Sequence, residues 1–233
     1  MSARGWLVRY RWENRFVPEE ERKLTRLERG SDMSRIFAFT DGVFAIAITL
    51  LILQIDVPTS ASSGSDLWHQ IGDESGNLFA FALSFVVIGF FWIGSHRLMR
   101  QINEFDRGLM ILNIAYLGLV VIVPFTSQLI GEYGRYFVAI AFYAGNLALI
   151  AILSYFLKQH ILKNHLEIPG YEWDLRLSGK SDLFNAAMFI GVLPFAYFFS
   201  TWALLLWFGN RWDPYQRKRE RIYDEAEQKA TVA

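Results

Sequence analysis

The stretch that most constrains this chain is Arg35 to Ile55, which reads RIFAFTDGVFAIAITLLILQI. After Asp41 the stretch is apolar, and its one hydroxyl belongs to Thr49. At 1.5 Å of rise per residue, a helix of about 21 residues covers about 30 Å, the thickness of the hydrocarbon core of a bilayer. A charged side chain in such a span costs about 3 kcal/mol or more unless a partner or water stabilises it. Arg35 and Asp41 are therefore candidate functional residues.

Composition places the chain among integral membrane proteins. Of its 233 residues, 53% are hydrophobic and 16% aromatic, and several further apolar runs have the length of a membrane span. There is no cysteine, which excludes disulfides and thiolate chemistry. The phosphate-binding loop, serine-hydrolase, zinc-protease and dinucleotide motifs are absent, as is the T-V-G-Y-G filter of common potassium channels. We expect no enzymatic activity, no cofactor, no metal site and no nucleic-acid partner.

The remaining apolar runs set the number of spans. They predict spans over about Asn77 to Arg97, Leu109 to Gln128 and Arg135 to Leu157. The last run, Asp182 to Asn210, fits one helix kinked at Pro194 or two short helices that turn near Phe199. With six spans, every Lys and Arg except Arg135 falls on the inner side, whereas five spans put the basic C-terminal tail outside. We expect an all-α protein with six transmembrane helices, the last two short, and both termini cytoplasmic.

The predicted organisation has three parts: a basic cytoplasmic arm (1–32), a six-helix transmembrane channel domain (33–210) and a charged cytoplasmic tail (211–233). In the arm, Glu19 to Arg29 fits a short surface helix, and Ser31 or Asp32 can cap the first membrane helix. A polar outer loop is expected over Thr59 to Gly76, and a polar inner segment over Lys158 to Ser181.

No internal repeat is present, so one subunit offers one copy of the Arg35 to Ile55 helix. If that helix lines a pore, several subunits must surround the pore with cyclic symmetry.

Polar residues at the inner ends of three spans predict a network. Arg35 and Asp41 lie six positions apart, so they do not stack on one helix face, and each needs partners on other helices. The candidate partners are Trp92 and His96 on the second span and Asn113 on the third. Their donors suit a carboxylate that is costly to leave unpaired. The network either locks the first three helices together or takes part in gating or proton sensing through His96.

An aliphatic stripe follows on the outer half of the first helix. Ile46, Leu50 and Leu53 share one face, with Thr49 at its margin. Every face of a helix in lipid can be apolar, so this spacing fits packing, lipid contact or a hydrophobic pore constriction. Gly42 would allow close helix contacts.

Three other polar residues receive structural expectations. Asn146 is expected to hydrogen-bond a neighbouring helix, and His160 and His165 are expected to be surface histidines.

Two motifs carry a resemblance. The first is R-x-x-x-F-[S/T]-D-G over Arg35 to Gly42, followed by VFAIAITLLIL, and the second is F-W-x-x-x-H-R at Phe91 to Arg97. Together they resemble the transmembrane protein 175 family of potassium channels, over about residues 31–210. Prokaryotic members with a single six-helix unit are homotetramers, whereas the lysosomal animal channel has two units per chain and dimerises. Thr40 stands where Ser is commoner and keeps the hydroxyl.

The resemblance implies passive potassium conduction, with modest selectivity over sodium, through a central pore lined by the first helix of four subunits. It assigns the constriction to Ile46, Leu50 and Leu53, and the pore hydroxyl linked to selectivity to Thr49. It assigns the signature motif and its inter-helix network to Arg35, Phe39, Thr40, Asp41, Gly42, Trp92, His96 and Asn113. The implied partners are the chain itself, membrane lipid and permeant potassium ions, in a bacterial cytoplasmic membrane.

Two other functions stay open from the sequence. A proton-linked transporter would use Asp41 and His96 as a relay, but it would need a substrate pocket and usually repeat symmetry. A non-conducting scaffold would show no ion flux after reconstitution.

Overall fold

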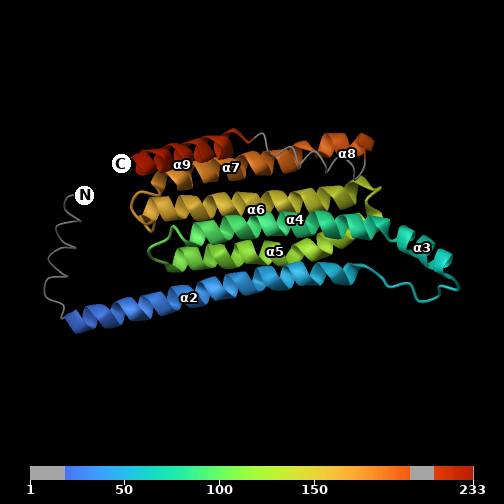
Figure 1. Cartoon of the computed structure of the whole chain (residues 1–233), viewed down its shortest axis with the longest axis horizontal. Coiled ribbons are helices and arrows are strands. Elements are labelled where there is room, and N and C mark those ends of the chain that lie inside the picture. Colours follow the sequence, from blue (N-terminus) through green and yellow to red (C-terminus); the bar gives the residue numbers. More distant parts are fainter. Residues whose placement is uncertain (1–18, 200–212, 233) are drawn as a thin grey trace. The chain divides into compact units, whose positions relative to one another are not determined.

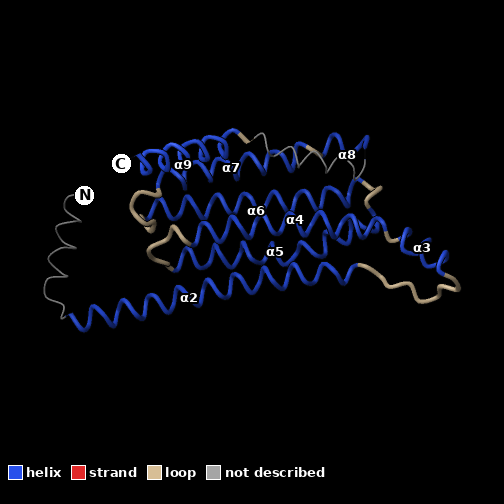
Figure 2. Tube along the Cα trace, in the orientation of Figure 1, coloured by secondary structure: helices blue, strands red, loops and turns tan. Residues whose placement is uncertain are grey.

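The computed structural model describes residues 19–199 and 213–232, and this part of the chain is helical and contains no β-strand (Figures 1 and 2). Its helices are α2 (Glu19–Leu50), the 3-10 helix η1 (Leu51–Gln54), α3 (Gly64–Asp73), α4 (Ser75–Met99), α5 (Arg107–Tyr133), α6 (Phe137–Asn164), α7 (Glu172–Gly191), α8 (Leu193–Phe199) and α9 (Pro214–Val232).

Four helical segments of the described chain are long and apolar enough to cross a membrane: Met33–Gln54, Ser75–Met99, Arg107–Tyr133 and Phe137–Asn164. They coincide with the first four predicted spans, and the protein is a multi-pass membrane protein. The segment predicted to be polar, Lys158 to Ser181, is largely helical, because α6 continues to Asn164 and α7 begins at Glu172. The proposed turn near Phe199 leads into residues 200–212, which lie outside the described residues, so the count of six spans stays a prediction.

The chain divides into two compact units, Met1–Phe39 and Thr40–Ala233. In the first unit the described residues form the N-terminal part of α2. This helix is continuous from Glu19, so the expected cap at Ser31 or Asp32 is wrong. Inside a helix the backbone N–H groups are bonded to the preceding turn, which leaves no free N–H for such a cap.

In the second unit, α6 packs against α5 and α7, and α4 packs against α5 (Figure 1). Hydroxyls join the helices in the middle of the bundle. Ser84 Oγ donates to Ser127 Oγ at 2.8 Å and lies 2.9 Å from the Tyr143 hydroxyl. Asn146 Nδ2 donates to the carbonyl of Leu119 on α5 at 3.3 Å, which confirms the expected contact. Such internal partners matter where lipid cannot supply hydrogen bonds.

The expected outer polar loop contains a helix. Ser63 caps α3 by accepting a hydrogen bond from the Asp66 N–H at 3.1 Å, so the Ser-rich sequence starts a helix within the loop.

On the opposite side of the bundle, the α4–α5 loop pairs with the α6–α7 loop. The Asn103 N–H donates to the Leu166 carbonyl, and the Ile168 N–H donates to the Gln101 carbonyl, both at 2.8 Å. The short antiparallel bridge between Ile102 and Glu167 lies between these two bonds.

Candidate functional site

From Thr40 onward, α2 has a buried face. Thr40, Phe44 and Ala47 are each 1% exposed, and Leu51 at the start of η1 is fully buried. Their spacing puts them on one side of the helix. The Phe44 ring lies 6.1 Å from the ring of Tyr116 on α5. This face therefore packs against the subunit's own bundle.

The opposite face carries the aliphatic stripe, which is exposed in the single subunit. The side chains of Ile46, Leu50 and Leu53 are 59%, 40% and 74% exposed. An exposed apolar stripe on a membrane helix contacts lipid, another protein surface or a pore.

Two small or polar residues interrupt this exposed face. The Thr49 hydroxyl donates to the Ala45 carbonyl at 3.0 Å and the Ile46 carbonyl at 2.9 Å, so its hydrogen stays within α2. A Cβ added at Gly42 would meet no atom within 4 Å, so no part of the same subunit requires a glycine there. The surface around Gly42 is open to close approach by another helix.

Consecutive residues anchor α2 to two different helices. Trp92 Nε1 on α4 donates to Asp41 Oδ1 at 2.9 Å. Asn113 Nδ2 on α5 donates to Thr40 Oγ1 at 3.0 Å. The first bond involves a carboxylate and is the stronger kind. Asn113 thus pairs with the hydroxyl of Thr40, and the expectation that it contacts the Asp41 carboxylate is wrong.

The structure brings His96 to Trp92. The two rings lie four residues apart on α4, with centroids 5.6 Å apart, and Trp92 therefore contacts both His96 and Asp41. Arg35 and Phe39 belong to the first unit, where they lie one helical turn apart on the same face of α2.

All of these residues fall within residues 35–124, which match the family model described as "Endosomal/lysosomal potassium channel TMEM175". A potassium channel of Streptomyces collinus is 43% identical to the chain, over 45% of this chain and 50% of its own length. A potassium channel of Chamaesiphon minutus is 38% identical, over 56% of this chain and 66% of its own length.

The crystal structure of a lysosomal potassium-selective channel TMEM175 homolog from Chamaesiphon minutus superposes with a TM-score of 0.67. Its sequence is 29% identical, and the match covers 78% of this chain and 97% of that chain. This chain is a prokaryotic member of the TMEM175 family. The aligned regions span between half and two thirds of the curated bacterial relatives named above.

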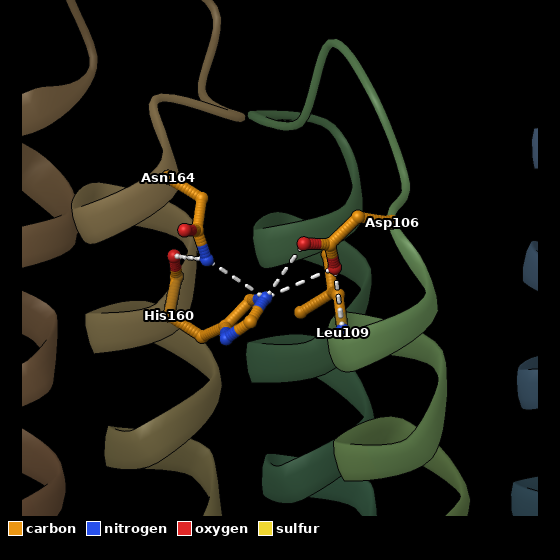
Figure 3. Close-up of polar contacts among 4 residues, drawn as sticks. All are labelled: Asp106, Leu109, His160 and Asn164. Atoms are coloured by element: carbon orange, nitrogen blue, oxygen red, sulfur yellow. Dashed lines mark hydrogen bonds and ion pairs between the residues drawn. The ribbon is translucent and has the colours of Figure 1, made fainter.

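In this TMEM175 family member, the polar residues that sequence reasoning missed lie mostly beyond the family match. One group joins α5 to α6 (Figure 3). His160 Nε2 lies 2.9 Å from both carboxylate oxygens of Asp106, and Asn164 Nδ2 lies 2.9 Å from the same nitrogen. Asp106 also caps α5, because its Oδ1 accepts from the Leu109 N–H at 2.7 Å. A Cβ on Gly108 would lie 2.6 Å from His160 Cε1, so only glycine leaves room for the imidazole.

The expectation that both histidines lie at the surface is wrong for His160 and confirmed for His165. The His165 side chain is 86% exposed, as expected for the surface, whereas that of His160 is 24% exposed and paired. Partial burial raises the pKa of Asp106, but hydrogen bonds from the Leu109 N–H and His160 outweigh it and hold the pKa below its usual value. An acidic residue before an apolar run is a cap signal, but nothing in the sequence pairs it with a histidine so far away.

Two further ion pairs of this TMEM175 family member involve α7. Lys158 Nζ on α6 lies 2.5 Å from Asp182 Oδ2. Asp174, in the first turn of α7, pairs with Arg219 on α9. In the sequence Lys158 is recognisable only as an inner-side charge, because partners on separate helices leave no periodic signal.

Proposed function

We propose that this TMEM175 family member is a potassium-permeable cation channel that conducts passively. Four copies of the chain would surround a central pore, each contributing α2, with lipid around them and potassium ions as the permeant species. The observation that carries the proposal is the division of α2 into two faces. One face is anchored in the subunit's own bundle, and the other leaves Ile46, Leu50 and Leu53 uncovered. The bacterial relatives named as potassium channels support the choice of ion.

In this proposal the uncovered stripe forms the constriction. A ring of aliphatic side chains repels water and makes an ion shed part of its hydration shell, which gates or filters permeation. Thr49 would add a ring of hydroxyls. The Thr49 hydroxyl donates its hydrogen to carbonyls of its own helix, so its oxygen can present a lone pair to a passing cation.

The signature residues would hold the pore helix at a fixed radius. Thr40 and Asp41 would transmit the position of α5 and α4 to α2 through their bonds to Asn113 and Trp92. Gly42 would face the neighbouring subunit, where its small size allows close approach. Arg35 and Phe39 complete the motif at the inner end of the same helix.

The geometry disfavours the transporter that would use Asp41 and His96 as a proton relay. Trp92 donates its N–H to Asp41 and places its ring against His96. An indole N–H is a donor only and does not pass protons between a carboxylate and an imidazole.

The deciding experiment is potassium flux from liposomes that contain the purified full chain. We expect efflux down the potassium gradient without a counter-substrate and without dependence on a pH gradient. Efflux that requires an opposing proton gradient would support the transporter instead. The absence of any flux would support a scaffold.

Pore lining can be tested separately with single cysteines, because the chain has none of its own. If four copies of the α2 stripe meet at an axis, Leu53→Cys will cross-link between subunits under mild oxidation. Leu149→Cys, on an exposed face of α6, is the matched control and should not cross-link. Equal cross-linking of both variants would remove α2 from the pore axis.

A further inference from the structure

The C-terminal helix α9 lies along α7 (Figure 1). A buried carboxylate, that of Asp213, directly precedes α9. Asp213 is fully buried, and it accepts hydrogen bonds from the Ser181 hydroxyl of α7 and from the Tyr215 N–H at 2.8 Å. It thus caps α9 and joins the start of that helix to α7.

One arginine makes the next contact, two turns later. Arg219 donates to both oxygens of Asp174, from Nε at 2.5 Å and from Nη2 at 2.9 Å. The Arg219 and Asp174 side chains are 8% and 1% exposed. This is a two-pronged, charge-assisted pair in a buried setting, where removal of one partner leaves an uncompensated charge.

A third element meets the same carboxylate. Gln101, in the α4–α5 loop, donates from Nε2 to Asp174 Oδ2 at 2.6 Å and is itself buried. The backbone of this loop is also paired with the α6–α7 loop through Asn103 and Ile168. Asp174 is therefore the point at which α7, α9 and the α4–α5 loop converge.

The α4–α5 loop connects the two helices that hold α2. Trp92, which bonds Asp41, lies two turns before the end of α4, and Asn113, which bonds Thr40, lies in the second turn of α5. A shift of the loop moves the ends of both helices, and with them both anchors of α2.

Most of the described side chains of α9 are exposed. Between residues 213 and 225, where side chains are described, only Asp213 and Arg219 are buried. Tyr223 adds a ring contact with Trp173, at 5.1 Å between centroids. A helix whose described side chains are mostly exposed can detach without unfolding the bundle.

We infer that Asp174, Arg219 and Gln101 are positioning residues through which α9 fixes the α4–α5 loop and, through that loop, the hold of Trp92 and Asn113 on α2. Detachment of α9 loosens that hold. A less firmly held α2 would widen the constriction and speed potassium flux. Only this effect on conduction rests on the proposed function.

The test is hydrogen exchange and potassium flux on the full chain carrying Arg219→Ala. We expect amide exchange of the α4–α5 loop and of residues 40–50 to rise about tenfold, and flux to rise about threefold. Arg221→Ala removes an exposed arginine of the same helix and is the matched control, with both readouts unchanged. Arg219→Lys keeps the positive charge but loses the two-pronged guanidinium contact with Asp174. Its exchange rates and flux should lie between those of Arg219→Ala and Arg221→Ala.

Gln101→Ala separates the steps of the coupling. It leaves the Asp174–Arg219 pair in place, so α9 should stay protected while residues 40–50 exchange faster. If Arg219→Ala frees α9 without changing exchange in the loop and in residues 40–50, the inference is wrong. If wild-type liposomes show no flux, the proposed channel function fails, and exchange of residues 40–50 still decides whether α9 positions α2.

Discussion

The helices α2 and α6 each expose an apolar stripe, and the two stripes differ in kind. On α2 the stripe is aliphatic and is interrupted by Gly42 and the hydroxyl of Thr49. On α6 the stripe consists of four bulky side chains, two of them aromatic: Val138, Phe142, Leu149 and Phe156. Small residues allow a helix to approach another closely, whereas large apolar side chains suit lipid. Exposure alone therefore does not identify a pore face, and the size and polarity of the exposed residues are more informative.

A polar side chain placed on each stripe should distinguish the two helices most strongly. Ile46→Asn should raise potassium flux about tenfold, because an amide hydrates a constriction that a fully apolar side chain keeps dry. Leu149→Asn on α6 should leave flux unchanged. Liposome flux per reconstituted protein is the measurement. If neither variant changes the flux, neither stripe faces the permeating ion. If both variants raise the flux equally, the α2 stripe is not the pore face that distinguishes the two helices.

A truncation should give a smaller effect of the same sign. Leu50→Ala widens the proposed ring without adding a polar group, so flux should rise about threefold and the preference for potassium over sodium should fall. Leu149→Ala is the matched truncation on α6. Flux measured in paired potassium and sodium gradients would test both statements, and unaltered values for Leu50→Ala would take Leu50 out of the constriction.

Removal of one hydroxyl tests the polar part of the α2 stripe. Thr49→Val keeps the shape of the side chain and should change the potassium-to-sodium flux ratio about twofold. Thr126→Val is a close control, because Thr126 on α5 also bonds its own helix, at the Val123 carbonyl, but is buried. A ratio that moves equally in both variants would point to helix stability rather than to pore chemistry.

The smallest effect concerns the anchoring of α6 and should appear in stability rather than flux. Asp106→Ala removes the cap of α5 and the partner of His160, and should lower the free energy of unfolding by about 1 kcal/mol. Asp106→Asn can still cap α5, so it should lower the free energy of unfolding by less than Asp106→Ala does. Thermal unfolding in detergent measures this, and a large change in flux would contradict the assignment of α6 to a supporting role.

The same group has a defined pH dependence. Because the folded-state pKa of Asp106 lies below its unfolded value, its stabilising contribution is present above the unfolded pKa and is lost as pH falls through the folded pKa. This stabilising contribution is therefore lost at strongly acidic pH. The free energy of unfolding of Asp106→Ala should decrease less in that pH range than that of the wild type. An equal decrease in the variant would assign the effect to other carboxylates.

The first four spans were predictable because each depends on a local property. The run predicted from Asn77 to Arg97 became α4 (Ser75–Met99), and an apolar run of that length has few stable alternatives to a membrane helix. The start of α7 was missed because its first residues are polar. Glu172 begins a helix there because the polar half of α7 packs against α9 rather than lipid.

The candidate site was predictable in part. The residue types at Thr40, Asp41, Trp92 and Asn113 indicated a polar network, but the pairing within it did not follow from spacing. Asn113 bonds Thr40, and Trp92 bonds Asp41, because the side chains available to each polar group depend on how three helices pack. The Asp174 cluster joins residues from three distant segments, and no periodicity marks it.

The sequence alone determined that this protein is an all-helical membrane protein with a charged motif at the start of its first span, since composition and the length of apolar runs are local quantities. Which face of α2 is packed and which is left open was decided only by the tertiary structure. In a membrane every face of a helix can be apolar, so burial leaves no periodic trace in the sequence. Only the packing of Phe44 and Leu51 into the bundle turns Ile46 and Leu53 outward.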